Sequence, residues 1–331
     1  MRRRRSNASG LRAAVAAAAV LCGAVQSAAA QGSLAEEGAL FLLVPVGARA
    51  VGMGQAVTAE EDGSEAVWWN PAGLARLEKR EAAIHHQRGL GYTADAVSLI
   101  VPSSLLGVIG LSVHIFDFGE IPSTDIIGTE GGEILTRAFV YAASYATPIG
   151  GRVNAGINYK IAQFRVECTG PCPPNAFSVA TSTALDLGLQ YDADWLVPLT
   201  LAAALRNVGP RFQVNDRAQS DGLPARLQIG ALYRVGQIQR YMKDAELHVT
   251  GDVLGEVQIR RPATHLGTDL IWRKRLHARA GWVFDTSELD GPSIGVGLTA
   301  GTLVLDVGQL LHGVSANGQT PPTYLSLRYL F

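Results

Sequence analysis

Residues 47–74 read GARAVGMGQAVTAEEDGSEAVWWNPAGL, and this stretch differs from everything that follows it. Its glycines interrupt any strand pattern, and it closes with the turn-forming run Asn70-Pro71-Ala72-Gly73. Proline fixes φ and removes a backbone donor, while an asparagine side chain can bond to nearby backbone, so a rigid turn is expected there rather than a catalytic group. The stretch is predicted to form a compact plug, within residues 31–78, ahead of a β-domain at residues 79–331.

The chain beyond the plug alternates between apolar and polar side chains. Val153, Ile157 and Ile161 would face one side of a strand, whereas Asn158 and Lys160 would face the other. In a membrane barrel, lipid-facing apolar residues alternate with lumen-facing polar or small ones. The same pattern occurs at residues 185–191, 226–235, 246–253, 277–282, 303–308 and 325–331. Weaker candidates are residues 81–90, 94–101, 107–116, 134–146, 197–207, 263–272 and 292–300.

Together these segments make about fourteen strands, an even number, as bacterial barrels prefer. No segment after residue 31 has the apolar length of a spanning helix, so a chain that crosses a membrane must do so as a closed barrel. The predicted fold class is therefore all-β, a transmembrane antiparallel β-barrel. Tight turns are expected at residues 103–104, 149–151, 273–275 and 301–302, and longer loops, including 117–133 and 166–181, at the opposite rim.

The first thirty residues have the features of a targeting segment. Arg2 to Arg5 are basic, Ala13 to Val25 form a short apolar region, and Ala28 to Ala30 supply the small residues of a cleavage site. The apolar run is shorter than the roughly 20 residues of a spanning helix. A cleaved signal peptide at residues 1–30 and an outer-membrane location in a Gram-negative cell are predicted.

Charge and cysteine content exclude several classes of function. The formal net charge of the 331 residues is −1, whereas nucleic-acid binding needs a basic face, so no nucleic-acid partner is expected. Cys168 and Cys172 could form a metal site or a redox motif, but no second pair or nearby histidine completes a zinc set. In an oxidising compartment a local disulfide is the favoured prediction.

No catalytic motif is present, so no enzyme activity, metal or cofactor is predicted. Barrel enzymes with a serine and a histidine on neighbouring strands exist, and Ser112 with His114, or Thr250 with His248, could be imagined in that role, but lumen-facing polar side chains are favoured. The expected lumen residues have both signs of charge, which favours ion pairs that hold the plug over an ion-selective pore. They are Glu246, Asp252, Asp186, Asp269, Asp306, Arg226, Arg234, Arg279 and Lys160, with Arg49, Glu60, Glu61 and Asp62 as plug partners.

The plug stretch resembles the N-terminal hatch of the long-chain fatty-acid transporter (FadL) superfamily, and GARAVGMGQAVTA with AVWWNPAGL is most similar to its PorV/PorQ branch. The motif match covers residues 47–74, and the strand pattern extends the likeness to Phe331. The residues that carry the motif are Gly47, Arg49, Gly52, Gly54, Asp62, Asn70, Pro71 and Gly73. Tyr329 and Phe331 resemble the C-terminal signal recognised by barrel-assembly machinery.

The resemblance implies two functions. The first is an accessory or docking component for protein export, as in type IX secretion, with exported proteins or secretion-system components as partners and loop 117–133 (Ile121, Ile126, Ile127) as a docking candidate. The alternative is a passive channel for hydrophobic small molecules, with a pocket between plug and wall at Val51, Met53 and Val57. Outer-membrane lipid is a partner in both, and a soluble periplasmic β-protein is a third, weaker interpretation.

Overall fold

In the computed structural model the chain is described at residues 37–60, 63–89, 91–124, 130–170, 177–193, 198–213, 220–256, 262–284, 290–311 and 321–331. The expected signal peptide at residues 1–30 lies outside these ranges, as do Glu61, Asp62 and Cys172. Cleavage of the signal peptide therefore stays a prediction. Within the described residues, no helix is both long enough and apolar enough to span a membrane.

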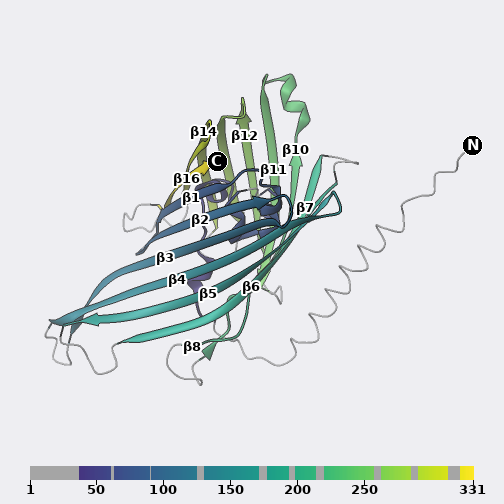
Figure 1. The fold of residues 1–331 in the computed structure, drawn as a ribbon. Coiled ribbons are helices and arrows are strands. Elements are labelled where there is room, and N and C mark those ends of the chain that lie inside the picture. The colour runs from purple at the N-terminus through teal and green to yellow at the C-terminus, as the bar shows by residue number, and fades with distance from the viewer. Residues whose placement is uncertain are drawn as a thin grey trace, which may run out of the picture.

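The wall of the molecule is a closed antiparallel barrel of fourteen strands, as the alternation predicts (Figure 1). The barrel closes where β1 pairs with β16, through Glu81 opposite Leu330. Its strands are β1 (Glu81–Arg88), β2 (Thr93–Ser103), β3 (Gly107–Thr124), β4 (Glu130–Ile149), β5 (Val153–Thr169), β6 (Ser178–Asp192), β7 (Leu199–Val208), β10 (Arg226–Arg234), β11 (Ala245–Glu256), β12 (Ala263–Trp272), β13 (Leu276–Phe284), β14 (Gly291–Ala300), β15 (Leu303–Leu310) and β16 (Thr323–Leu330). A small hairpin of β8 (Phe212–Gln213) and β9 (Ser220–Asp221) lies between β7 and β10 in the chain.

The two faces of the wall have the expected chemistry. On β5, Ile157 and Tyr159 are 40% and 46% exposed on the outer face, whereas Asn158 and Lys160 between them are buried inside. The outward side chains suit lipid, and the inward polar ones must find partners in the lumen because water does not reach them freely. The alternation of apolar and polar residues in the sequence thus corresponds to an apolar outer face and a polar inner face of the barrel.

The two ends of the barrel differ in the lengths of their connections and strands. Four of the tight connections fall at one rim, beside Glu81 and Leu330, and the β10–β11 connection there contains the 3₁₀ helix η4 (Gly236–Arg240). At the other rim β3 to β6 are much longer than β13 to β16 and extend as a sheet beyond them (Figure 1).

The prediction of long loops at residues 117–133 and 166–181 was therefore wrong in large part. β3 continues to Thr124 and β4 begins at Glu130, with a register shift between Asp117 and Glu120, while β5 continues to Thr169. Cross-strand hydrogen bonds sustain these extensions although their outer face has become charged. Ile121 is exposed on β3, and Ile126 and Ile127 lie outside the described residues.

The plug is a set of short helices enclosed by the barrel wall. They are η1 (Leu40–Leu43), α2 (Ala48–Gly52), α3 (Ala66–Trp69) and η2 (Pro71–Arg76). Asn70 ends α3 and caps η2, where Pro71 takes the first position, which needs no backbone donor. In Figure 1 this purple segment lies within the ring of strands. Most of its side chains are fully buried, so the plug fills the lumen as a core fills a globular domain.

Candidate functional site in the barrel lumen

The backbone of the plug lies directly against the backbone of the wall. A Cβ on Gly281 of β13 would lie 2.0 Å from the Gly54 nitrogen, and one on Gly156 of β5 would lie 2.3 Å from the Pro71 carbonyl carbon. Both distances are shorter than any real Cβ contact, so only glycine admits the plug at these two points. The same close approach occurs at Gly188, Gly267 and Gly308. These five wall glycines therefore form a surface, called here the glycine seat, that fits the backbone of the plug.

Asn70 fastens the plug to the wall. Its side chain is fully buried, accepts a hydrogen bond from Ala72 N (3.1 Å), and donates to Thr58 O (2.8 Å) and Leu189 O (3.4 Å). Asn70 therefore joins two parts of the plug to each other and to β6. The rigid turn that the sequence predicts is present, and its contact with the wall is made at β6.

Ion pairs occupy part of the lumen, as the mixed charges of the lumen-facing wall residues predict. Arg279 donates to Asp269 (3.0 Å) and to Asp306 (2.6 Å), and all three side chains are buried. Arg328 lies 3.6 Å from Asp306 and 3.9 Å from Glu81. Because each of these charges has a partner of opposite sign, the cluster links β1, β16, β15, β13 and β12 along one side of the lumen.

A second group of charges belongs to the plug itself. Arg49 donates to Glu60 (3.0 Å), and Glu60 also contacts His248 Nδ1 of β11 (2.7 Å). Glu65 lies near the Ala50 amide (3.3 Å), and burial raises the pKa of its carboxyl from the ordinary 4.5 to about 7, against the opposing effect of Arg328. Near neutral pH, Glu65 is thus a carboxyl group close to its titration point.

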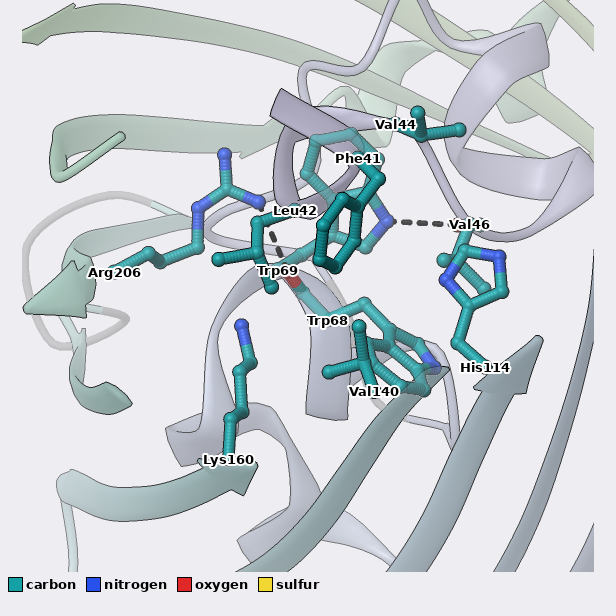
Figure 2. Close-up of a pocket in the computed structure, with 10 residues that line it drawn as sticks. All are labelled: Phe41, Leu42, Val44, Val46, Trp68, Trp69, His114, Val140, Lys160 and Arg206. Atoms are coloured by element: carbon teal, nitrogen blue, oxygen red, sulfur yellow. Dashed lines mark hydrogen bonds between the residues drawn. The ribbon is translucent and has the colours of Figure 1, made fainter. Parts of the chain in front are cut away.

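A narrow cavity lies between the plug and the wall on the side of the long strands (Figure 2). Its volume is about 10 Å³, which is room for about one water molecule and no organic ligand. Apolar and aromatic side chains of the plug form most of its lining, together with three basic residues of the wall. The lining consists of Phe41, Leu42, Val44, Val46, Trp68, Trp69, His114, Val140, Lys160 and Arg206.

Aromatic rings close the space above this cavity. The Phe41 ring of η1 packs against Phe116 (5.7 Å between centroids), Phe164 (6.3 Å) and Phe212 (6.2 Å). Phe118 continues the cluster beside Phe116 and Phe164. These rings come from the plug, from the long strands β3 and β5, and from β8. They form a closed aromatic cluster next to the cavity, on the side of the long strands.

Residues 37–46, the leading segment, carry Phe41 and are attached to the rest of the molecule at both ends. Glu37 forms a two-point ion pair with Arg226 (2.6 and 2.7 Å), and Gly38 N donates to Gly222 O (2.9 Å). At its other end, Trp69 Nε1 donates to Val46 O (2.9 Å; Figure 2). The Glu37 and Arg226 side chains are only partly buried, so the outer end of the segment is its weaker attachment.

Basic groups flank the apolar cavity. Arg206 donates from Nη1 to Trp68 O (2.9 Å) and stacks over Trp69 at 5.1 Å, while its buried Nε has no hydrogen-bond partner among the described residues. Lys160 Nζ is 2.6 Å from Asp186 and 3.0 Å from Asn207 Oδ1. One unsatisfied cationic donor beside an apolar space suits a ligand that has both an oily body and a polar end.

The structure places the predicted residues as follows. The plug-motif residues Gly47, Arg49, Gly52, Gly54, Asn70, Pro71 and Gly73 are buried in the plug. Val51, Met53 and Val57 are fully buried too, and they are not in the cavity lining. Tyr329 and Phe331 lie stacked on the outer face, and their assembly role stays a prediction. Cys168 is disulfide-bonded, and its expected partner Cys172 is not described.

The sequence placed Trp68 and Trp69 in the plug and Lys160 in the lumen, but it did not single out Phe41 or Arg206. Phe41 lies in the apolar run Leu40–Val46, which directly precedes the motif and could have been assigned to the plug face. No sequence signal pointed to Arg206. The imagined catalytic pairs have other partners, since Ser112 donates to Ser98 (2.8 Å), His114 packs against Trp68 and His248 contacts Glu60.

Comparison with solved structures supports the same architecture. The chain is similar to the Pseudomonas putida toluene transporter TodX, with a TM-score of 0.59 and 11% identity over 86% of this chain and 98% of that one. It is also similar to the Ralstonia pickettii toluene transporter TbuX (TM-score 0.53, 12% identity, 86% and 97% covered). A Pseudomonas aeruginosa FadL homologue gives a TM-score of 0.53 at 12% identity, with 86% and 98% covered.

At these identities the likeness shows the fold alone, which this chain shares with the three proteins. Two of these neighbours are toluene transporters, and the third is a FadL homologue. None of the three is described as a PorV or PorQ protein, so that finer resemblance stays a prediction. No protein-family model and no curated protein sequence matches the chain.

Proposed function

We propose that this protein is an outer-membrane channel for small hydrophobic molecules, closed in the present conformation by its plug. The observation that carries the proposal is the buried aromatic cluster of Phe41, Phe116 and Phe164, which adjoins the mostly apolar cavity beside Trp68. Buried aromatic surface with few polar groups is the usual lining of a site for apolar ligands. An aqueous pore would instead be lined by hydrated polar groups.

The fold likeness to two toluene transporters and a FadL homologue supports this channel better than the docking role in protein export that was placed first. No described feature of the extended strands specifies a secretion partner. The location in the outer membrane and export through a cleaved signal peptide belong to the same proposal.

Transport requires the leading segment to move. The cavity admits about one water molecule, so a ligand the size of a single aromatic ring fits only after Phe41 withdraws from the surrounding rings. The partly buried outer attachment at Glu37 and Arg226 is where such a movement would begin. The unsatisfied Nε of Arg206 then favours hydrophobic molecules with one acidic group over fully neutral ones, whereas Lys160 is already paired with Asp186.

A disulfide that locks the leading segment tests the proposal. A Cβ on Gly38 would lie 2.8 Å from the Asp221 Cβ, so the pair Gly38→Cys and Asp221→Cys needs to open by about 1 Å to reach disulfide geometry. Cells that depend on this protein for uptake are given toluene or octanoate, with and without reductant. The proposal expects uptake by wild type in both conditions and by the double variant only when reduced.

Wild type with and without reductant controls for the native Cys168 disulfide, and each single cysteine variant controls for the substitutions. If cells with the wild-type protein took up both compounds no faster than cells without it, the channel proposal would be overturned. Uptake that is equal in the oxidised and the reduced double variant would leave the channel but overturn the moving segment.

A further inference from the structure

The outer face of the barrel changes from apolar to charged at one level of the long strands. On β4, outward side chains from Phe139 to Ile149 include Tyr141 and Tyr145, and the next outward residue beyond Phe139 is Arg137. The ten residue steps from Phe139 to Ile149, at about 3.3 Å each and a tilt of about 40°, rise about 25 Å. That height matches the apolar band of an outer-membrane barrel, so Arg137 lies at headgroup level.

A second arginine lies beside the first. Arg137 and Arg165 are directly opposite each other on β4 and β5. Like charges in this position repel each other unless an anion lies between them. Together with Leu135, Phe139 and Glu167 they surround a hollow of about 60 Å³ on the outside of the wall.

The protein holds the two guanidinium groups without using their outer nitrogens. Arg137 donates through Nε to Asp117 (3.3 Å), and Arg165 donates through Nε to Gln163 (2.7 Å) while lying 5.1 Å over the Phe139 ring. These contacts orient both groups, and among the described residues no partner is found for their terminal nitrogens. Two oriented guanidinium groups with free terminal donors can bind the oxygens of one phosphate.

We propose that this hollow is a binding site for the phosphate of a lipid headgroup in the outer leaflet. The phosphate oxygens accept from Arg137 and Arg165, and the acyl chains run down over the apolar face that begins at Phe139 and Tyr141. The placement of the two arginines directly above an aromatic girdle favours a lipid over a soluble anion, because only a lipid uses both surfaces. Glu167, which also lines the hollow, opposes the phosphate and moderates its affinity.

Binding of lipid A to the full-length protein in detergent tests the site. Native mass spectrometry or a fluorescence titration would compare lipid A with its dephosphorylated form. The double variant Arg137→Gln, Arg165→Gln should bind phosphorylated lipid A at least tenfold more weakly, whereas Arg240→Gln on η4 at the other rim should bind as wild type does. Dephosphorylated lipid A should bind all three proteins equally weakly.

The variant Glu167→Gln gives a result of opposite sign, because removing the carboxylate should tighten binding several-fold. It also keeps the test informative if the double variant assembles poorly, which a gel-mobility shift on boiling would reveal. Equal binding of the two lipid forms by wild type, or weaker binding by Glu167→Gln, would overturn the site. Displacement of lipid A by millimolar inorganic phosphate would show a simple anion site and would overturn the lipid assignment.

Discussion

The seat of the plug can be disturbed by one methyl group. In Gly281→Ala, the new Cβ would lie 2.0 Å from the Gly54 nitrogen and 2.2 Å from the Met53 carbonyl carbon. Ordinary contact begins near 3.4 Å, so the plug must retreat by more than 1 Å. Neither neighbour is a flexible side chain, because both atoms belong to the plug backbone. The substitution should therefore displace the plug rather than be absorbed locally.

The expected cost has two parts. Overpacking a close-packed interior costs about 1–3 kcal/mol. The retreat also breaks the buried hydrogen bond from Gly54 N to Ser293 Oγ (3.0 Å), which contributes about 1 kcal/mol. A total of about 2–4 kcal/mol corresponds to a change of about 30-fold to 1,000-fold in the ratio of seated to displaced plug.

Two measurements detect a displaced plug. Limited proteolysis should cut Gly281→Ala within residues 47–74, and liposomes containing it should leak a small solute that wild type retains. The matched control is Gly251→Ala, whose Cβ would lie 3.4 Å from Leu266 Cδ2, an ordinary contact. If Gly281→Ala proved as protease-resistant and as tight as Gly251→Ala, the reasoning about the glycine seat would be refuted.

Three further predictions concern single polar residues. Asn70→Ala removes two buried hydrogen bonds and one partly buried one and should loosen the plug by about 2–4 kcal/mol, seen as faster proteolysis with an unchanged mobility shift on boiling. Because burial raises the pKa of Glu65 to about 7, the folded plug holds a proton that the unfolded chain loses above its ordinary pKa of 4.5. The plug should thus lose up to about 3 kcal/mol of stability as pH rises from about 4.5 through 7, and Glu65→Gln should abolish that dependence in denaturant titrations. Arg279→Met leaves Asp269 and Asp306 without their main partner and should destabilise the barrel by about 3–5 kcal/mol, measured as a lower temperature of the mobility shift; no change would show that Arg328 alone suffices.

The barrel could be predicted from the sequence because lipid imposes a strict rule on the outer face. Every second residue of a strand such as β5 must be apolar within the bilayer, and Ile157 and Tyr159 follow that rule. Beyond the bilayer the rule ends. Asp117 and Arg137 are outward and charged, so the alternation disappears although the hydrogen-bonded ladder continues. This is why the extended strands were mistaken for loops.

The plug and the cavity were predicted less completely. The Asn-Pro turn follows from local chemistry, and its rigid geometry is present. The place where it docks depends on which strands lie across the lumen, and that depends on the circumference of the closed barrel. For the same reason nothing in the sequence could bring Phe41 together with Phe212, or Arg206 with Trp68, since these pairs are distant in the chain and form only across the enclosed space.

The glycine seat also constrains the order in which the molecule can be built. The plug touches early and late parts of the wall at once, through Pro71 at Gly156 of β5 and through Ala48 at Gly308 of β15. The pairing that closes the barrel joins Glu81 to Leu330, which are about 250 positions apart, and contacts of such range are slow to form. A plug whose backbone fits the wall this closely has no room to enter a barrel that has already closed. We therefore expect the strands to assemble around the plug, which acts as a template for barrel closure.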